Sequence, residues 1–226
     1  MYEKHIYNLI YNKKYNYVLL NTIQAKICDT IIVVILMEFN KVDSPEKLLK
    51  FMNINIKYGF KGKNGKKYSD LFSEEWNDWY KQCIVQTGEE VLKSGIGTCW
   101  DQVELERLWF ENHNYEIKTF FIWFEIEYEN NYPTHTFLLY KKDNKWYWFE
   151  HAFEDYRGIH EFNNIDEAIE YVILKYLEYA VNNGIAKSED RKLIVTYEYS
   201  KLEKTVNVDD YINHVTNKET SKKYNH

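Results

Sequence analysis

The chain has 226 residues, of which 45% are hydrophobic and 28% charged, so it is long enough for one globular domain with a substantial core. Two prolines and eight glycines are too few for a linker-rich or disordered chain. The net charge of −6, without a sustained stripe of Lys and Arg, argues against nucleic acid as a partner.

The two ends of the chain differ from its middle. Residues 1–36 are rich in Tyr, Asn and Lys without a clear period, and we interpret them as an N-terminal extension, with Met37 as an alternative start. Residues 37–216 form the main domain. Residues 217–226 are a polar tail that we expect to be frayed.

The apolar and cysteine patterns predict a cytoplasmic protein without a membrane partner. The longest apolar run near the start, Ile31–Met37, is far shorter than the roughly 18 residues of a membrane span, and no secretory signal pattern precedes it. The three cysteines, Cys28, Cys83 and Cys99, include no CxxC pair. We therefore expect free thiols in a reducing compartment.

Helix signals dominate the first part of the main domain. Ser44 and Pro45 start a helix that extends to about Asn53. The segment Tyr58–Asp70 is punctuated by glycine and lysine and indicates a loop or hairpin, and Phe72–Tyr80 fits either a helix or a loop.

Two helix starts follow within eleven residues. Thr87 to Glu90 matches a capping box and predicts a short helix through Leu92. After a break at Gly95-Ile96-Gly97, Thr98 and Asp101 repeat the pattern and predict a helix from Cys99 to about Asn112.

Strand signals dominate the second part. Segments 116–128, 134–142 and 145–153 are rich in aromatic and β-branched residues, and the last two are joined at Asp143-Asn144. Asn164 caps a helix over 165–182, and 192–200 alternates as a final strand. Helices followed by strands, a helix and a strand predict an α+β domain with an antiparallel sheet.

Cys99 is a candidate nucleophile because it is the first residue of its predicted helix. The positive end of the helix dipole favours thiolate over thiol, and the unpaired N–H groups there can bind an oxyanion. The alternative is a small buried residue near a cap, as most free cysteines are.

A base for Cys99 comes from the predicted hairpin. With a two-residue turn, Lys142 pairs with Lys145, and His135 and Glu150 become diagonal neighbours on one sheet face, while His151 falls on the other. A carboxylate there orients an imidazole as base. Taken singly, His135 is more often a satisfied core histidine, and Glu150 a salt-bridge partner.

Three segments, Gly97–Asp101, Thr134–Tyr140 and Trp146–Glu150, resemble in chain order the motif blocks of the transglutaminase-like superfamily, which is related to papain. The resemblance implies a small bacterial member with a papain-like core, in which the cysteine-bearing helix packs on the antiparallel sheet. It also implies a catalytic triad of Cys99, His135 and an acid, usually Asp and here Glu150. The flanking domains and calcium sites of animal transglutaminases are not carried over, and we expect no cofactor.

Other candidate residues are less specific. Gln86 and Trp100 are tentative oxyanion or substrate contacts, and Gln82 is a second candidate donor, although polar flanking or core packing is the commoner role. Arg107 fits a substrate carboxylate less well than an intrahelical ion pair. The histidines lack the spacing of a zinc site, and we expect no metal.

Together these features predict a cysteine-dependent acyl transfer through a thioester, with a peptide or protein amide as substrate. Hydrolysis by a protease, peptidase or deamidase is the leading interpretation. A cross-linking transglutaminase and a catalytically silent binding module of the same fold are the alternatives. The oligomeric state stays open.

Overall fold

The computed structural model describes residues 30, 32–70, 73–126 and 133–225. The chain divides into two compact units, Met1–Val42 and Asp43–His226. In the first unit, residues 32–39 are helical. The expectation that residues 1–36 form an extension therefore falls largely outside the described residues.

The second unit is a mixed α+β domain whose sheets are mainly antiparallel. Its helices are α2 (Pro45–Asn55), α3 (Trp79–Gln82), α4 (Gly88–Ser94), α5 (Cys99–Asn112), α6 (Ile165–Asn182) and α7 (Val208–Val215). Short 3-10 turns occupy Glu74–Trp76, Glu154–Tyr156 and Ser188–Leu193. Its strands are β1 (Lys57–Tyr58), β2 (Phe60–Gly62), β3 (Lys67–Tyr68), β4 (Cys83–Val85), β5 (Ile96–Gly97), β6 (Glu116–Phe124), β7 (Thr134–Lys142), β8 (Lys145–Glu150), β9 (Gly158–Phe162), β10 (Ile194–Glu198), β11 (Val206–Asn207) and β12 (Lys222–Asn225).

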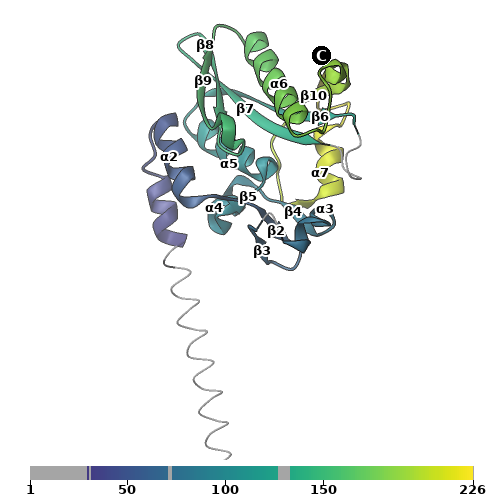
Figure 1. Cartoon of the computed structure of the whole chain (residues 1–226). Helices are drawn as coiled ribbons and strands as arrows, with labels where there is room; N and C mark the ends of the chain where they lie inside the picture. Colours follow the sequence, from purple (N-terminus) through teal and green to yellow (C-terminus); the bar gives the residue numbers. More distant parts are fainter. Residues whose placement is uncertain (1–29, 31, 71–72, 127–132, 226) are drawn as a thin grey trace, which may run out of the picture. The chain divides into compact units, whose positions relative to one another are not determined.

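A six-stranded antiparallel sheet, in the order β12-β10-β6-β7-β8-β9, lies between α5 and α6 (Figure 1). On the α5 side, Phe110 stacks on Tyr140 of β7 with ring centroids 4.5 Å apart. On the α6 side, Phe137 and Trp148 join a core cluster with Val172. Because both sheet faces are covered, the strands carry apolar residues on both sides, as the sequence pattern indicates.

The hairpin register predicted from the sequence is confirmed. Lys142 pairs with Lys145, and Leu138 pairs with Phe149 farther along the ladder. The two turn residues, Asp143 and Asn144, both have positive φ, 51° and 61°, as a tight hairpin turn requires. The α6 side of the sheet therefore receives the odd-numbered side chains of β7, and the register keeps them beside the even-numbered ones of β8.

Two smaller sheets build the other side of the domain. β11-β4-β2-β3 is antiparallel, and its β2–β3 hairpin lies where a loop or hairpin was expected. The two-stranded sheet is parallel and pairs Tyr58 of β1 with Gly97 of β5. This pairing links the segment after α2 to the turn that precedes α5.

The helix predictions agree closely with the structure, with one local difference. Ser44 Oγ accepts a hydrogen bond from Lys47 N–H at the start of α2, and α5 spans Cys99–Asn112 as expected. Thr87 precedes α4, but its side chain makes no capping hydrogen bond, so the predicted capping box is not formed there.

The end of the chain differs from its expected fraying. Lys222–Asn225 forms the edge strand β12, which pairs with β10. Tyr224 explains this, because its hydroxyl donates to Glu198 (2.7 Å) and its ring packs on Phe120. One aromatic side chain thus anchors an otherwise polar segment.

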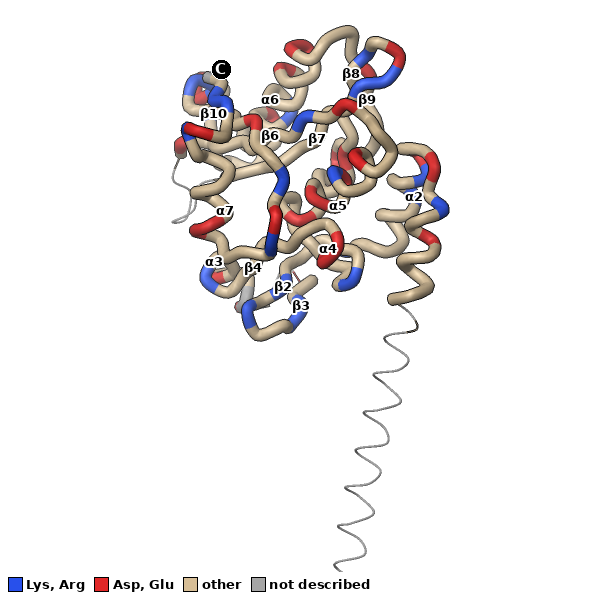
Figure 2. The backbone as a smooth tube through the Cα atoms, turned by 180° about the vertical axis from the view of Figure 1, so that it is seen from behind, with Lys and Arg blue, Asp and Glu red and all other residues tan. Residues whose placement is uncertain are grey.

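Basic and acidic positions are both spread over the backbone of the domain (Figure 2). Among the described residues, no helix combines the length and the apolar character needed to span a bilayer.

Candidate active site

The start of α5 is fixed by a buried carboxylate. Asp101 Oδ2 accepts hydrogen bonds from the N–H and the hydroxyl of Thr98, both at 2.8 Å, and Oδ1 accepts from the N–H of Gln86 at 2.7 Å. Burial raises the pKa of Asp101 to about 6, although these hydrogen bonds oppose the rise. The predicted Thr98–Asp101 cap thus also holds the neighbouring Gln86 loop.

Gly97 permits this tight turn. A Cβ at position 97 would lie 2.6 Å from Cβ of Asp101, closer than real side chains approach. Only a glycine lets the β5 backbone pass so close to the capping carboxylate. The turn presents Cys99 as the first residue of α5, with 7% of its surface exposed.

His135 and Glu150 meet on the α6 side of the main sheet. His135 Nε2 lies 3.0 Å from Glu150 Oε2, and both residues are buried, with exposed fractions of 6% and 2%. The ring of His135 stacks beside Tyr176 of α6, with centroids 6.1 Å apart. A carboxylate at Nε2 fixes the tautomer with a proton on Nε2, which leaves Nδ1 to accept a proton.

Glu150 is itself held by two further donors. Trp148 donates its indole N–H to Oε2 at 3.2 Å, and the N–H of Phe153 donates to Oε1 at 2.7 Å. These bonds explain why β8 ends at Glu150 and not at residue 153, since the chain turns back over its own carboxylate. The sequence signal for Trp148 was its place two residues before Glu150, on the same strand face.

The Cys99 thiol is close enough to His135 to affect the titration of the imidazole. Burial by itself lowers the pKa of His135, but the Glu150 charge and the neighbouring Cys99 outweigh it and raise the pKa to about 10. The imidazole therefore favours its protonated form over the whole neutral range. An imidazolium beside a sulfur stabilises that sulfur as thiolate.

Cys99 and His135 line one pocket of about 380 Å³. Its walls come from β1, the segment that follows β8, and α6. The other lining residues are Tyr58, Thr134, Ala152, Phe153, Glu154, Asp155, Arg157, Tyr176 and Tyr179. Aromatic rings dominate the walls, while charged side chains lie at the segment 154–157. A small polar molecule or an extended peptide side chain fits a pocket of this size.

Glu106 is a buried carboxyl that sequence reasoning missed. It follows Cys99 by seven residues, or two helical turns, and is 3% exposed. Burial first, and then the Glu150 charge, raise the pKa of Glu106 well above its ordinary value. Burial and the Glu150 charge thus both disfavour the ionised form of Glu106.

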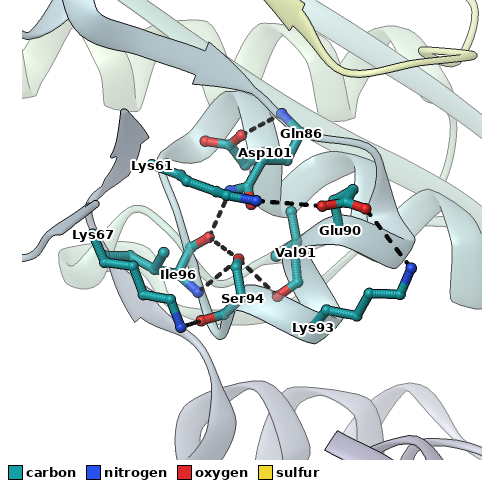
Figure 3. Close-up of polar contacts among 9 residues, drawn as sticks. All are labelled: Lys61, Lys67, Gln86, Glu90, Val91, Lys93, Ser94, Ile96 and Asp101. Atoms are coloured by element: carbon teal, nitrogen blue, oxygen red, sulfur yellow. Dashed lines mark hydrogen bonds and ion pairs between the residues drawn. The ribbon is translucent and has the colours of Figure 1, made fainter. Parts of the chain in front are cut away.

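Gln86 and Trp100, the tentative oxyanion contacts, donate their side-chain N–H groups to other residues of the protein. Gln86 donates one Nε2 hydrogen to the carbonyl of Ile96 at 2.9 Å (Figure 3), and Trp100 donates its indole N–H to Thr134 Oγ1 at 3.2 Å. Neither residue lines the pocket. Gln86 instead holds the β5 turn, and Trp100 ties the start of α5 to the strand that carries His135.

His151 lies on the other face of the sheet from His135, as the register predicted. Its Nδ1 contacts the side-chain oxygen of Gln102 on α5, and Gln102 in turn donates to the carbonyl of Gly97 at 2.8 Å. Burial and the nearby Arg157 charge lower the pKa of His151 to about 4. A neutral His151 therefore supports the turn before Cys99 through Gln102, from the opposite face of the sheet to His135.

The remaining candidates have structural roles. Cys83 is fully buried and burial raises the pKa of its thiol, while Cys28 lies outside the described residues. Arg107 forms the predicted ion pair with Glu104, with Nε and Oε2 3.3 Å apart. Within the described part of the chain, no group of three or more His, Cys, Asp or Glu side chains is placed to hold a metal ion.

No family model matches the chain, and a search of the curated proteins finds no match.

Proposed function

We propose that the protein transfers acyl groups through a covalent thioester on Cys99. His135 acts as the general acid when the thioester forms and as the general base when it is released, and Glu150 orients the imidazole and stabilises its charged form. The observation that supports this most is the position of His135, whose Nε2 lies 3.0 Å from Glu150 and whose side chain lines one pocket with Cys99.

The reaction has two steps, formation of the thioester and its release. The Cys99 sulfur attacks the carbonyl carbon of an amide or ester, a C–S bond forms, and the π electrons move to the oxygen. When the tetrahedral intermediate collapses, the bond to the leaving group breaks and His135 donates its proton to that group. Water or an amine then attacks the thioester, gives its proton to His135 and releases the acyl product.

We favour hydrolysis as the outcome, because water reaches any open pocket. The likeness of the three motif blocks to the transglutaminase-like superfamily keeps amine transfer as a second candidate. One observation favours it: the exposed carboxylates of Glu154 and Asp155 line the pocket and attract cationic amines. A silent binding module would gain nothing from a buried His135–Glu150 pair aimed at a thiol.

Selective alkylation tests the nucleophile. Brief treatment with iodoacetamide near neutral pH, read by peptide mass spectrometry, should label Cys99 before Cys83, since thiolates react and buried thiols do not. His135→Ala should abolish that preference. His160→Ala is the matched control, because His160 contacts the carbonyl of Tyr156 outside the pocket.

Acyl transfer itself is tested with p-nitrophenyl acetate. We expect one acetyl group on Cys99 in a rapid first turnover and none in Cys99→Ala. Addition of a primary amine then separates the two outcomes: acetylated amine indicates transfer, and free acetate alone indicates hydrolysis. Equal labelling of all cysteines, with no acetyl-enzyme, would refute the enzymatic proposal in favour of a binding module.

A further inference from the structure

The proposed reaction places negative charge on the carbonyl oxygen of the intermediate, and hydrogen-bond donors must meet it. The start of α5 supplies N–H groups. The N–H groups of Asp101 and Gln102 are bonded to the carbonyl of Thr98, and that of Thr98 to Asp101. Within the described residues, the N–H of Cys99 has no such acceptor, so it is available as one donor.

The second donor must come from another element close to Cys99. The parallel pairing of β1 with β5 places Tyr58 opposite Gly97, two residues before Cys99. The N–H of Gly59 donates to the carbonyl of Gly97 at 3.3 Å and fixes this register. Main-chain pairing, and not a flexible loop, therefore sets the position of Tyr58.

The side chain of Tyr58 lines the pocket together with Cys99 and His135. Its ring stacks against Trp76, with centroids 6.3 Å apart and an interplanar angle of 13°. Tyr58 is 39% exposed, and its hydroxyl forms no hydrogen bond with the described residues, so it is open to a molecule that enters the pocket. Because its ring is stacked on Trp76 and its side chain lines the pocket of Cys99, Tyr58 is placed to contact a molecule bound there.

The surroundings keep this hydroxyl protonated. A tyrosine hydroxyl is protonated at neutral pH, and the packing around Tyr58 and the Cys99 charge raise its pKa further. A phenol that does not ionise beside a thiolate acts as a hydrogen-bond donor over the working pH range. Two of the donors considered from the sequence, Gln86 and Trp100, instead have side-chain N–H groups bonded to Ile96 and Thr134.

We infer that the Tyr58 hydroxyl is the second donor of the oxyanion hole, paired with the N–H of Cys99. This inference rests on the proposed acyl transfer. Tyr58 donates a hydrogen bond to the carbonyl oxygen as the C–S bond forms and keeps its proton throughout. The charge returns to the carbonyl when the leaving group departs, so Tyr58 contributes no net proton to the reaction.

Two reactions of the same sulfur distinguish this role. Acylation by p-nitrophenyl acetate passes through an oxyanion, whereas alkylation by iodoacetamide displaces iodide at a saturated carbon and forms none. In Tyr58→Phe we expect acylation to slow by about a hundred-fold, the usual cost of one oxyanion donor, with KM little changed. Alkylation of Cys99 should stay within about three-fold of the unmodified chain, which also reports an intact thiol site.

Tyr147→Phe is the matched control. It removes a tyrosine hydroxyl of β8 that donates to Glu161 of β9 on the exposed surface. It should change neither rate. Unchanged acylation in Tyr58→Phe would overturn the inference, and so would equal losses in both reactions, since these would assign Tyr58 to the thiol itself. If the unmodified chain shows neither selective alkylation nor acetylation, the proposed function fails first.

Discussion

Nε2 of His135 lies 3.0 Å from Oε2 of Glu150, and Trp148 donates a second hydrogen bond to the same oxygen. Because Oε2 is shared by two donors and Oε1 is bonded to a main-chain N–H, the carboxylate cannot rotate freely. The imidazole is therefore held in one orientation before any substrate arrives.

Glu150→Gln should lower the pKa of His135. The change keeps the side-chain size but removes the negative charge that raises this pKa to about 10. We expect the titration midpoint of the His135 ring, measured by NMR, to move toward the ordinary value of 6.5, and the alkaline loss of acylation to move with it. Glu161→Gln, at an exposed carboxylate on β9, should leave both unchanged. An unmoved midpoint in Glu150→Gln would contradict the assigned pairing.

The same pair should make stability fall in alkali. A histidine whose pKa is raised on folding stabilises the fold fully below its ordinary pKa of 6.5. That stabilisation is lost as the pH rises through about 10. Denaturant titrations between pH 6 and 10 should show this decline in the unmodified chain and a flatter profile in Glu150→Gln. Parallel profiles would mean that the pair does not titrate as described.

Gly97→Ala should distort the turn before Cys99. The added Cβ meets Cβ of Asp101 at 2.6 Å, so the cap must shift, at a cost of about 1–3 kcal/mol. Thermal unfolding measures the stability, and iodoacetamide labelling measures the reactivity of Cys99, which should fall. Gly65→Ala is a useful comparison, because its Cβ meets nothing within 4 Å and only its positive φ is strained. If Gly65→Ala alone reduced labelling of Cys99, the steric explanation would be wrong.

Asp101→Asn should loosen both the α5 cap and the Gln86 loop. Both carboxylate oxygens of Asp101 now accept hydrogen bonds, whereas an asparagine has only one acceptor oxygen. We expect the free energy of unfolding to fall by about 1–3 kcal/mol. Because the pKa of Asp101 is raised to about 6, its contribution is fully present below the ordinary value of 3.8 and is lost as pH rises through about 6. The stability gap between the two proteins should therefore widen as the pH falls from 6 to 4. A gap that is constant with pH would exclude titration of Asp101.

A chain that ends after Ser221 tests the edge strand. Removing β12 deletes the Tyr224 hydrogen bond to Glu198 and its contact with Phe120. We expect the free energy of unfolding to fall by about 1–3 kcal/mol. Hydrogen exchange in β10 should be faster, because that strand becomes an exposed edge. A shortened chain as stable as the full one would support the original expectation of a frayed tail.

The sequence predicted those features whose causes are local. The helix start at Ser44-Pro45, the boundaries of α5 and α6, and the tight turn at Asp143-Asn144 depend on residues within a few positions of one another. From that turn alone, the period of two in a strand gave the register that brings His135 next to Glu150.

Other features depend on partners far apart in the chain. The expected capping bond of Thr87 is absent. The polar tail forms a strand because Tyr224 packs on Phe120 and donates a hydrogen bond to Glu198. Gln86 and Trp100 were candidates by proximity in sequence to Cys99, but the fold directs their N–H groups to Ile96 and Thr134.

By itself, the sequence determined which residue stands at the positive end of a helix and which histidine and acid share a strand face, because capping and strand alternation are short-range effects. Only the tertiary structure decided that Cys99 and His135 share a pocket, that Tyr58 lines it with them, and that Glu106 is buried. The reason is physical: burial and long-range pairing depend on how separate elements pack, and no periodicity within one segment encodes its neighbours.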